Sequence, residues 1–193
     1  STKWGYLTAC PTNTGTGLRG TVMIHLPTLV FTNNISKILQ ATAKLGLNVR
    51  GLYGEGTEAS GNIFQVSNQA SMGRTEDDLI DNINRIISQI ISREEATRKG
   101  IMLKNKEAVT DRAWRAYGTL KNAHIITSQE TIAHLSTIRL GVDLGIINVI
   151  DRRIVNDLFI LTQPAHLQKL EGKVLSAEER DMKRADLIRE KLR

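Results

Sequence analysis

The chain has 193 residues, which is enough for one substantial domain or two small ones with their own cores. Hydrophobic residues make up 40% and charged residues 24%, as in ordinary soluble globular proteins. No apolar run approaches the roughly 20 residues that a membrane-crossing helix needs, so we expect no membrane partner. The charge of +6 forms no continuous basic run and aromatics are only 4%, which disfavours direct nucleic-acid binding. The single cysteine, Cys10, excludes an internal disulfide and favours a cytoplasmic location.

The first 73 residues are predicted to form strands, loops and one helix, since they hold 10 of the 15 glycines. Asn34 is expected to cap a helix that runs to about Leu45 and ends at Gly46. Two glycine-bearing loops are expected at 11–19 and 54–61. The candidate strands are 5–10, 20–26, 47–53 and 62–67.

From Thr75 onwards the sequence predicts helices. Three acidic residues follow Thr75, as at the start of a helix, and isoleucines then recur at helical spacing to about Lys99. Gly100 is expected to interrupt this helix, and Pro164 to break the chain later. The further helices expected are 101–121, 128–137, 139–146, 151–160 and 176–192, with Ser128, Asp151 and Ser176 as N-caps. The chain is therefore predicted to be α+β, with one domain over 1–100 and a helical domain over 101–193.

The segment 10–20, CPTNTGTGLRG, contains the spacing of a dinucleotide-binding glycine motif. That motif must open a helix, but the residues that follow are rich in β-branched side chains and predict a strand. A dinucleotide site is therefore excluded. The loop could bind another phosphate through backbone N–H groups and Arg19, or it could be an ordinary hairpin loop.

Four polar residues in or beside these loops could carry chemistry: Cys10, Arg19, Arg50 and Glu55. Arginines suit polyphosphate, a loop carboxylate can act as a base, and a thiol near arginines can persist as thiolate. Each also has a purely structural alternative. We expect no metal site, because the four histidines show no ligand spacing, and no Walker A lysine is present.

A capping box is predicted where the last helix begins, with Ser176 as N-cap and Glu179 at the third helical position. Arg180 and Arg184 follow as a like-charged i,i+4 pair, which an anion bound between them would stabilise. Asp181 beside them could hold a cation. The alternative is a solvated helix face on which acids neutralise the arginines.

Two long motifs, CPTNTGTGLRG and VRGLYGEGTEASGNIFQVSNQ, occur in an order that closely resembles the C-terminal lobe of the guanidino (phosphagen) kinases. The resemblance covers about residues 4–74. It implies that Cys10 contacts a substrate guanidinium, that Arg19 and Arg50 bind nucleotide phosphates, and that Glu55 orients the guanidinium and acts as base. It also implies ATP as donor and Mg²⁺ held mainly through the nucleotide.

The helical remainder resembles the bacterial protein-arginine kinase branch of this family, called McsB type. That branch carries an R-D-x-x-R-A motif that binds phosphoarginine allosterically, matched here by Arg180, Asp181, Arg184 and Ala185. The resemblance implies protein substrates with exposed arginines, marking for a Clp protease, a zinc-binding activator protein and a homodimer. Because the family's N-terminal lobe is not matched, we expect a fragment with little activity alone. A phosphoarginine-reading and dimerisation module, or a small-molecule phosphagen kinase, remain alternatives.

Overall fold

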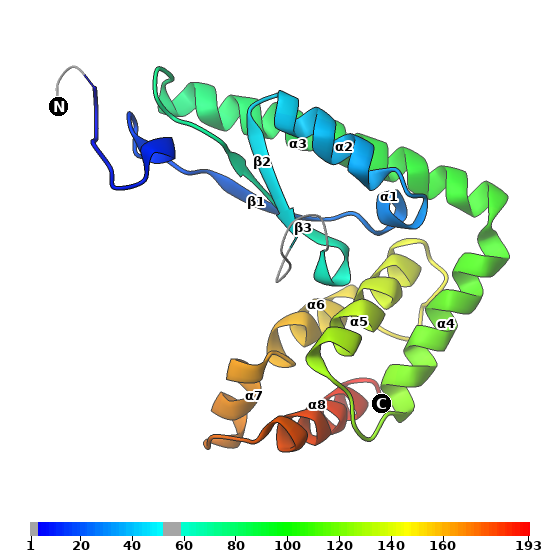
Figure 1. The fold of residues 1–193 in the computed structure, drawn as a ribbon. Helices are drawn as coiled ribbons and strands as arrows, with labels where there is room; N and C mark the ends of the chain where they lie inside the picture. The colour runs from blue at the N-terminus through cyan, green and yellow to red at the C-terminus, as the bar shows by residue number, and fades with distance from the viewer. Residues whose placement is uncertain (1–3, 52–58) are drawn as a thin grey trace. The chain divides into compact units, whose positions relative to one another are not determined.

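An antiparallel sheet organises the first part of the chain (Figure 1). The computed structural model describes residues 4–51 and 59–193. Within these residues the sheet has three strands, β1 (Thr21–His25), β2 (Leu47–Gly51) and β3 (Ile63–Asn68), in the order β1-β3-β2. β3 therefore pairs with both neighbours. With the helices described below, this sheet confirms the predicted α+β class.

One face of the sheet forms the core of this region. Side chains alternate along a strand, so Phe64 and Val66 of β3 point to the same side as Ile24 of β1, and all three are buried. Helix α2 (Ile35–Lys44) and helix α3 (Glu76–Lys104) supply the other half of this core. The α3 side chains in it are Ile83, Ile86, Ile87 and Ile90. The opposite face carries polar side chains together with the apolar Met23 and Ile63.

The predicted strand over 5–10 is wrong. That segment makes a single bridge, between Tyr6 and Gly15, and the side chains of Tyr6 and Leu7 are 70% and 72% exposed. Gly5 adopts a φ of +70°, outside the range of an extended strand. A lone bridge with exposed side chains on it cannot supply the burial that stabilises a strand.

Pro27, the residue after the predicted strand over 20–26, begins a helix. Helix α1 (Pro27–Phe31) tolerates proline at its first position, where the missing N–H has no helical partner. The buried carboxylate of Glu94 in α3 accepts hydrogen bonds from the backbone N–H groups of Thr28 (3.1 Å) and Leu29 (3.0 Å). This short helix therefore depends on a carboxylate far along the chain.

The expected interruption at Gly100 is also wrong, because α3 continues through it to Lys104. A glycine costs about 1 kcal/mol in a helix, and the burial of Ile101 directly after it offsets that cost. The helix ends instead at Lys104, and Asn105 separates it from α4 (Lys106–Asn122).

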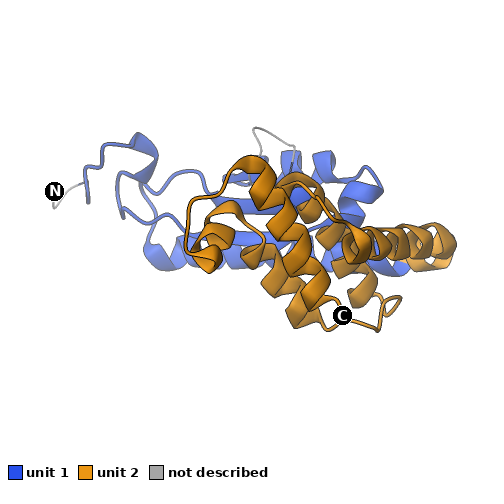
Figure 2. Cartoon of the chain, turned by 90° about the horizontal axis from the view of Figure 1, so that it is seen from below, with its two compact units in different colours: residues 1–99 blue, residues 100–193 orange. Residues whose placement is uncertain are grey.

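The chain divides into two compact units, residues 1–99 and 100–193 (Figure 2). The second unit is helical in its described elements: α4 is followed by α5 (Ser128–Asp143), α6 (Arg152–Leu161), α7 (Pro164–Glu171) and α8 (Ala177–Lys191). Its core draws side chains from α4, α5, α6 and α8. In the part of the chain that the structure describes, no helix is long and apolar enough to cross a bilayer.

The helix ends of the second unit only partly follow the sequence prediction. The N-caps Asp151 and Ser176 are confirmed, the latter with a complete capping box. Two helices expected at 128–137 and 139–146 are one helix, α5, whose N-cap is Thr127 rather than Ser128. Pro164 does not simply break the chain but occupies the first turn of α7.

Candidate active site

The sheet face opposite the core carries polar side chains from all three strands. In β2, Arg50 is paired with Gln65 of β3, and Asn48 is paired with Ser67. Residues two apart along a strand share a face, so Asn48, Arg50, Gln65 and Ser67 lie on one side. Arg50 is exposed there. One guanidinium predicted to bind phosphate therefore stands on an open, polar surface.

Arg19 reaches the same face from the segment before β1. Its Nη2 donates a hydrogen bond to Oγ of Ser67 at 3.3 Å, and the residue is exposed. The structure thus brings Arg19 and Arg50 to one face, on either side of the central strand. Two arginines that face the same open space can neutralise the oxygens of one polyphosphate.

The backbone on both sides of Arg19 is held by one side chain. Asn68, at the end of β3 and 3% exposed, accepts a hydrogen bond from Gly20 N at Oδ1 (2.8 Å). Its Nδ2 donates to the carbonyl oxygen of Leu18 at 3.1 Å. Ser67 therefore fixes the side chain of Arg19, and Asn68 fixes its backbone.

The loop that carries Cys10 is held in place by Ser71, which follows β3 in the chain. Ser71, which is fully buried, donates from its backbone N to Thr12 O (3.2 Å) and from Oγ to Thr14 O (3.1 Å). Gly15 has a φ of +111°, and a Cβ at this position would lie 2.9 Å from Cα of Met72. Only glycine fits here, so this glycine of the sequence motif serves close backbone packing.

Cys10 presents a free and exposed thiol at the start of this loop. Its Sγ lies 3.0 Å from Oγ1 of Thr12. The hydrogen bond from the Thr12 hydroxyl lowers the pKa of the Cys10 thiol, with smaller contributions from the Thr12 backbone and from the charge of Arg19. A thiol with a lowered pKa holds more thiolate at neutral pH, and a thiolate attracts a guanidinium.

Glu55, the predicted loop carboxylate, lies outside the described residues. Sequence reasoning did not single out Ser67, Asn68 and Ser71, although the first two belong to the motif FQVSNQ. Their signal was a run of small hydrogen-bonding side chains directly after a predicted strand. Over the described ranges 4–51 and 59–193, no group of three or more His, Cys, Asp or Glu residues could hold a metal ion.

The R-D-x-x-R-A motif lies in the first turns of α8, and its two arginines have different surroundings. Arg184 is 1% exposed. Its Nε donates to Thr162 O at 2.9 Å and its Nη1 to Ile126 O at 2.8 Å, and the same Nη1 pairs with Asp181. Arg184 therefore joins α8 to the segments that precede α5 and follow α6.

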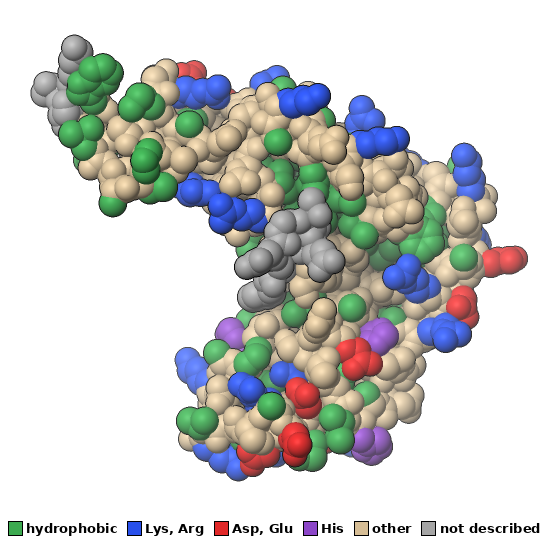
Figure 3. All heavy atoms as spheres, viewed as in Figure 1, with side chains coloured by type: hydrophobic (Ala, Val, Ile, Leu, Met, Phe, Trp, Pro, Cys, Tyr) green, Lys and Arg blue, Asp and Glu red, His purple; other side chains and the backbone are tan. Residues whose placement is uncertain are grey.

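Arg180 is half-buried, and its side chain has no hydrogen-bond or ion-pair partner among the described residues. The Asp181 side chain, already paired with Arg184, keeps 25% of its surface exposed. The structure thus brings Asp181 and Arg184 together. Arg180 is the arginine of the motif whose side chain has no partner among the described residues. On the face drawn in Figure 3, acidic and cationic side chains are mixed over the second unit.

Comparison with known proteins identifies the family. Residues 1–97 match the model of the ATP:guanido phosphotransferase C-terminal catalytic domain. The chain belongs to the ATP:guanido phosphotransferase family. Residues 106–193 of this family member match the model of the protein-arginine kinase McsB C-terminal domain.

Similar proteins of the same family are named protein-arginine kinase. One from Halothermothrix orenii is 53% identical over 193 residues, which are 100% of this chain and 55% of the relative. One from Bacillus subtilis is 52% identical over 188 residues, 97% of this chain and 52% of the relative. This ATP:guanido phosphotransferase chain thus spans about half the length of these relatives. A solved lombricine kinase is 33% identical, with a TM-score of 0.43, over 50% of this chain and 26% of that chain.

Proposed function

We propose that this chain is the C-terminal part of a protein-arginine kinase, which transfers the γ-phosphoryl group of ATP to a guanidino nitrogen of arginine side chains in proteins. The observation that carries the proposal is the placement of Arg19 and Arg50 on one exposed sheet face. The charge of Arg19 also helps to lower the pKa of the Cys10 thiol. The relatives named protein-arginine kinase support the same substrate class.

The described residues fit the nucleotide's phosphates. Arg19 and Arg50 would bind the phosphate oxygens and neutralise charge that grows on them during transfer, which supplies most of the catalysis of phosphoryl transfer. ATP with Mg²⁺ supplies the phosphoryl group when bound. Because the described residues contain no carboxylate cluster, the metal would be held through the nucleotide.

The arginine substrate would be held at the Cys10 loop. A Cys10 thiolate would attract the substrate guanidinium and keep it beside the phosphate-binding arginines. As the P–O bond to ADP breaks and the P–N bond forms, the attacking nitrogen must lose a proton. The family resemblance assigns that proton to the carboxylate of Glu55.

Nucleotide binding tests the first half of this proposal. Calorimetric titration of the chain with MgADP is expected to show binding that weakens at least tenfold in Arg19→Ala and in Arg50→Ala. The matched control is Arg85→Ala, which removes one exposed charge from α3, where Arg85 only bonds Asn82 (2.9 Å). Equal affinities in all four proteins would contradict the assignment of the two arginines.

We expect phosphoryl transfer to require more than this chain, since it spans about half the length of its relatives. We expect the chain alone to transfer little or no phosphate. A chimaera that joins the N-terminal part of the Halothermothrix orenii relative to this chain is expected to phosphorylate arginines in a denatured protein substrate, detected by mass spectrometry. A chimaera that phosphorylates only free arginine would instead support a small-molecule phosphagen kinase.

We propose a second role for α8, the binding of phosphoarginine by the motif Arg180, Asp181 and Arg184, in which the buried Arg184 would hold Asp181 in position. The Arg180 side chain, which has no partner among the described residues, would bind the phosphate, and the exposed part of Asp181 would bind the guanidinium. Titration with phosphoarginine is expected to show binding that Arg180→Ala abolishes and Arg153→Ala, an exposed arginine of α6, leaves unchanged. Binding that survives Arg180→Ala would contradict this role.

The remaining partners follow from the proposed kinase function. We propose that the complete protein acts in the cytoplasm, marks its protein substrates for a Clp protease, is controlled by a zinc-binding activator protein and forms a homodimer. The family resemblance supports these proposals.

A further inference from the structure

The segment 5–10 exposes apolar side chains at positions where a strand would bury them. Tyr6 and Leu7 are 70% and 72% exposed. Trp4 and Met72 are more than half exposed, and together with Tyr6 they line an open hollow of about 590 Å³ beside the start of α3. An exposed apolar patch of this kind marks a surface to which another part of a protein binds.

The backbone of this segment is paired along one edge and unpaired along the other. Tyr6 N donates to Gly15 O at 2.8 Å, and Gly15 N donates to Tyr6 O at 3.1 Å. In such an antiparallel pair, neighbouring residues direct their backbone groups alternately to the two sides, so those of Leu7 point away from Gly15. Among the described residues, Leu7 and Ala9 have no hydrogen-bond partner. The outer edge is therefore free to pair with another strand.

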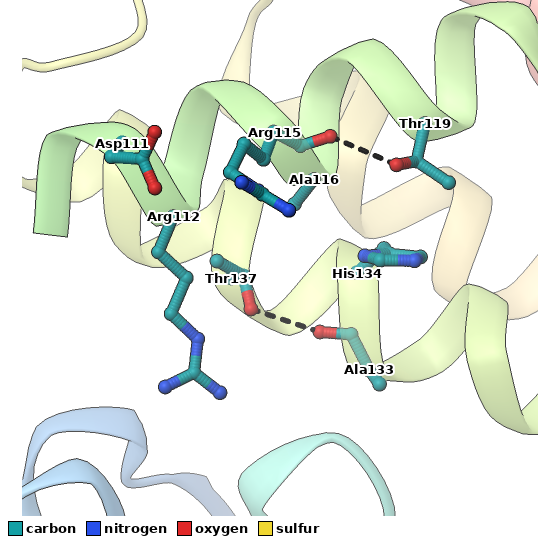
Figure 4. Close-up of a pocket in the computed structure, with 8 residues that line it drawn as sticks. All are labelled: Asp111, Arg112, Arg115, Ala116, Thr119, Ala133, His134 and Thr137. Carbon is teal, nitrogen blue, oxygen red and sulfur yellow. Dashed lines mark hydrogen bonds between the residues drawn. The ribbon is translucent and has the colours of Figure 1, made fainter. Parts of the chain in front are cut away.

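The hollow between α4 and α5, drawn in Figure 4, shows the contrast with an ordinary helical surface. There Thr119 Oγ1 donates to Arg115 O at 3.0 Å, and Thr137 Oγ1 donates to Ala133 O at 3.1 Å. Backbone groups inside a helix are also bonded to one another, so such a groove cannot accept a strand. Segment 5–10 differs because its exposed side chains are apolar and the backbone groups of Leu7 are unpaired.

The two faces of the segment show what kind of partner would cover it. Side chains alternate along extended backbone, so Tyr6 and Leu7 point to opposite faces, and both faces are bare. A single added strand would pair with the edge but leave both faces uncovered. The partner must therefore be a folded part that supplies a strand and packs on the faces. The relatives of this chain are about twice as long, so they contain a part of sufficient size.

We propose that, in the complete protein, a strand of the N-terminal part pairs with the outer edge of segment 5–10 at Leu7. The same part covers the side chains of Tyr6 and Leu7. Segment 5–10 then becomes a strand that ends at Cys10, and this thiol is held from both sides, by the added strand before it and by the Ser71 contacts after it. The inference rests on the proposed function only in taking this chain as the C-terminal part of a longer kinase.

The test is hydrogen exchange, followed by mass spectrometry of peptides that cover 5–10. It compares this chain with the chimaera that carries the N-terminal part of the Halothermothrix orenii relative. The amide of Leu7 is expected to exchange at least about 100-fold more slowly in the chimaera, as a paired amide does. Leu7→Asp in the chimaera should abolish this protection. The matched control is Leu45→Asp, at an exposed leucine directly after α2, which should preserve it. Peptides from α5 report that each protein is folded.

The contrary results are distinct. Equal exchange of segment 5–10 in the chain and in the folded chimaera would overturn the proposal. So would protection that survives Leu7→Asp, or protection of the isolated chain that grows with its concentration, which would show that a second copy pairs with this edge. Exchange does not require phosphoryl transfer. A chimaera that protects 5–10 but transfers no phosphate would therefore count against the proposed function and support this inference.

Discussion

Replacement of Arg184 by methionine should destabilise the second unit strongly, because this side chain is buried with three acceptors. The substitution keeps much of the volume but removes both donors to Thr162 O and Ile126 O, as well as the partner of Asp181. Each buried acceptor left without a donor costs about 1–3 kcal/mol. Asp181 adds less, because 25% of its side chain is exposed and water can solvate it. The expected loss in the free energy of unfolding is about 3–5 kcal/mol.

Urea denaturation followed by tryptophan fluorescence measures this loss. Trp114 lies in α4 of the second unit, so a Trp4→Phe background leaves it as the single reporter. The matched control is Arg180→Met, one turn earlier on the same helix, which should change stability by less than about 0.5 kcal/mol. A loss below about 1 kcal/mol in Arg184→Met would refute the reasoning that these contacts hold α8 in place.

This prediction decides how phosphoarginine binding should be tested. If Arg184→Met unfolds or loosens the second unit, lost binding in that variant reports folding rather than recognition. Arg180, which is half-buried and without a partner in the described chain, can be replaced without that effect. Arg180 is therefore the informative position for the proposed pocket.

Three further predictions concern the first unit. Asn68→Ala should destabilise it by about 1–3 kcal/mol in urea unfolding, because the hydrogen bonds to Gly20 N and Leu18 O on either side of Arg19 are lost; if Arg19 binds phosphate as proposed, MgADP binding should weaken as well. Glu94→Ala should cost about 3–5 kcal/mol in the same assay, since two buried N–H groups and the Arg98 guanidinium lose their acceptor. Alkylation of Cys10 by iodoacetamide should have its pH midpoint below that of a free cysteine, since the lowered pKa raises the thiolate fraction at each pH; Thr12→Val should move the midpoint up.

Each of these has a clear contrary result. An Asn68→Ala chain that binds MgADP as tightly as the original would show that the Asn68 hydrogen bonds do not position Arg19. Glu94→Ala with unchanged stability would mean that α1 finds another cap. A Cys10 alkylation midpoint at or above that of a free cysteine, or one that Thr12→Val leaves in place, would contradict the influence of the Thr12 hydroxyl.

Local patterns in the sequence predict much of this fold. The isoleucine spacing predicts α3, and the capping box at Ser176 predicts the start of α8, because each signal lies within a few residues of the structure it specifies. α1 could not be predicted in this way, since its capping carboxylate, Glu94, is distant in sequence. Gly100 continues a helix because tertiary burial outweighs its weak propensity.

The charged residues of the candidate site could be predicted from the sequence. The residues that hold them in position could not. Arg19 and Arg50 follow from the family motifs, and strand alternation then explains why they share a face. The role of Asn68 depends on which backbone groups the fold brings to the end of β3. These groups belong to Leu18 and Gly20, which are distant in sequence, so a local sequence pattern cannot predict the contact. For the same reason the spacing of Arg180 and Arg184 shows a pair but not the burial of one member.

The two hydrogen bonds of the Asn68 side chain affect how this protein can change during evolution. Its amide group reproduces, with a side chain, one extra rung of a β-ladder, and so ties Leu18 and Gly20 to the end of β3. Residues before Leu18 can therefore gain or lose length without shifting the arginine between the two tied peptides. Variation in the loop before Leu18 is thereby separated from the position of the Arg19 side chain.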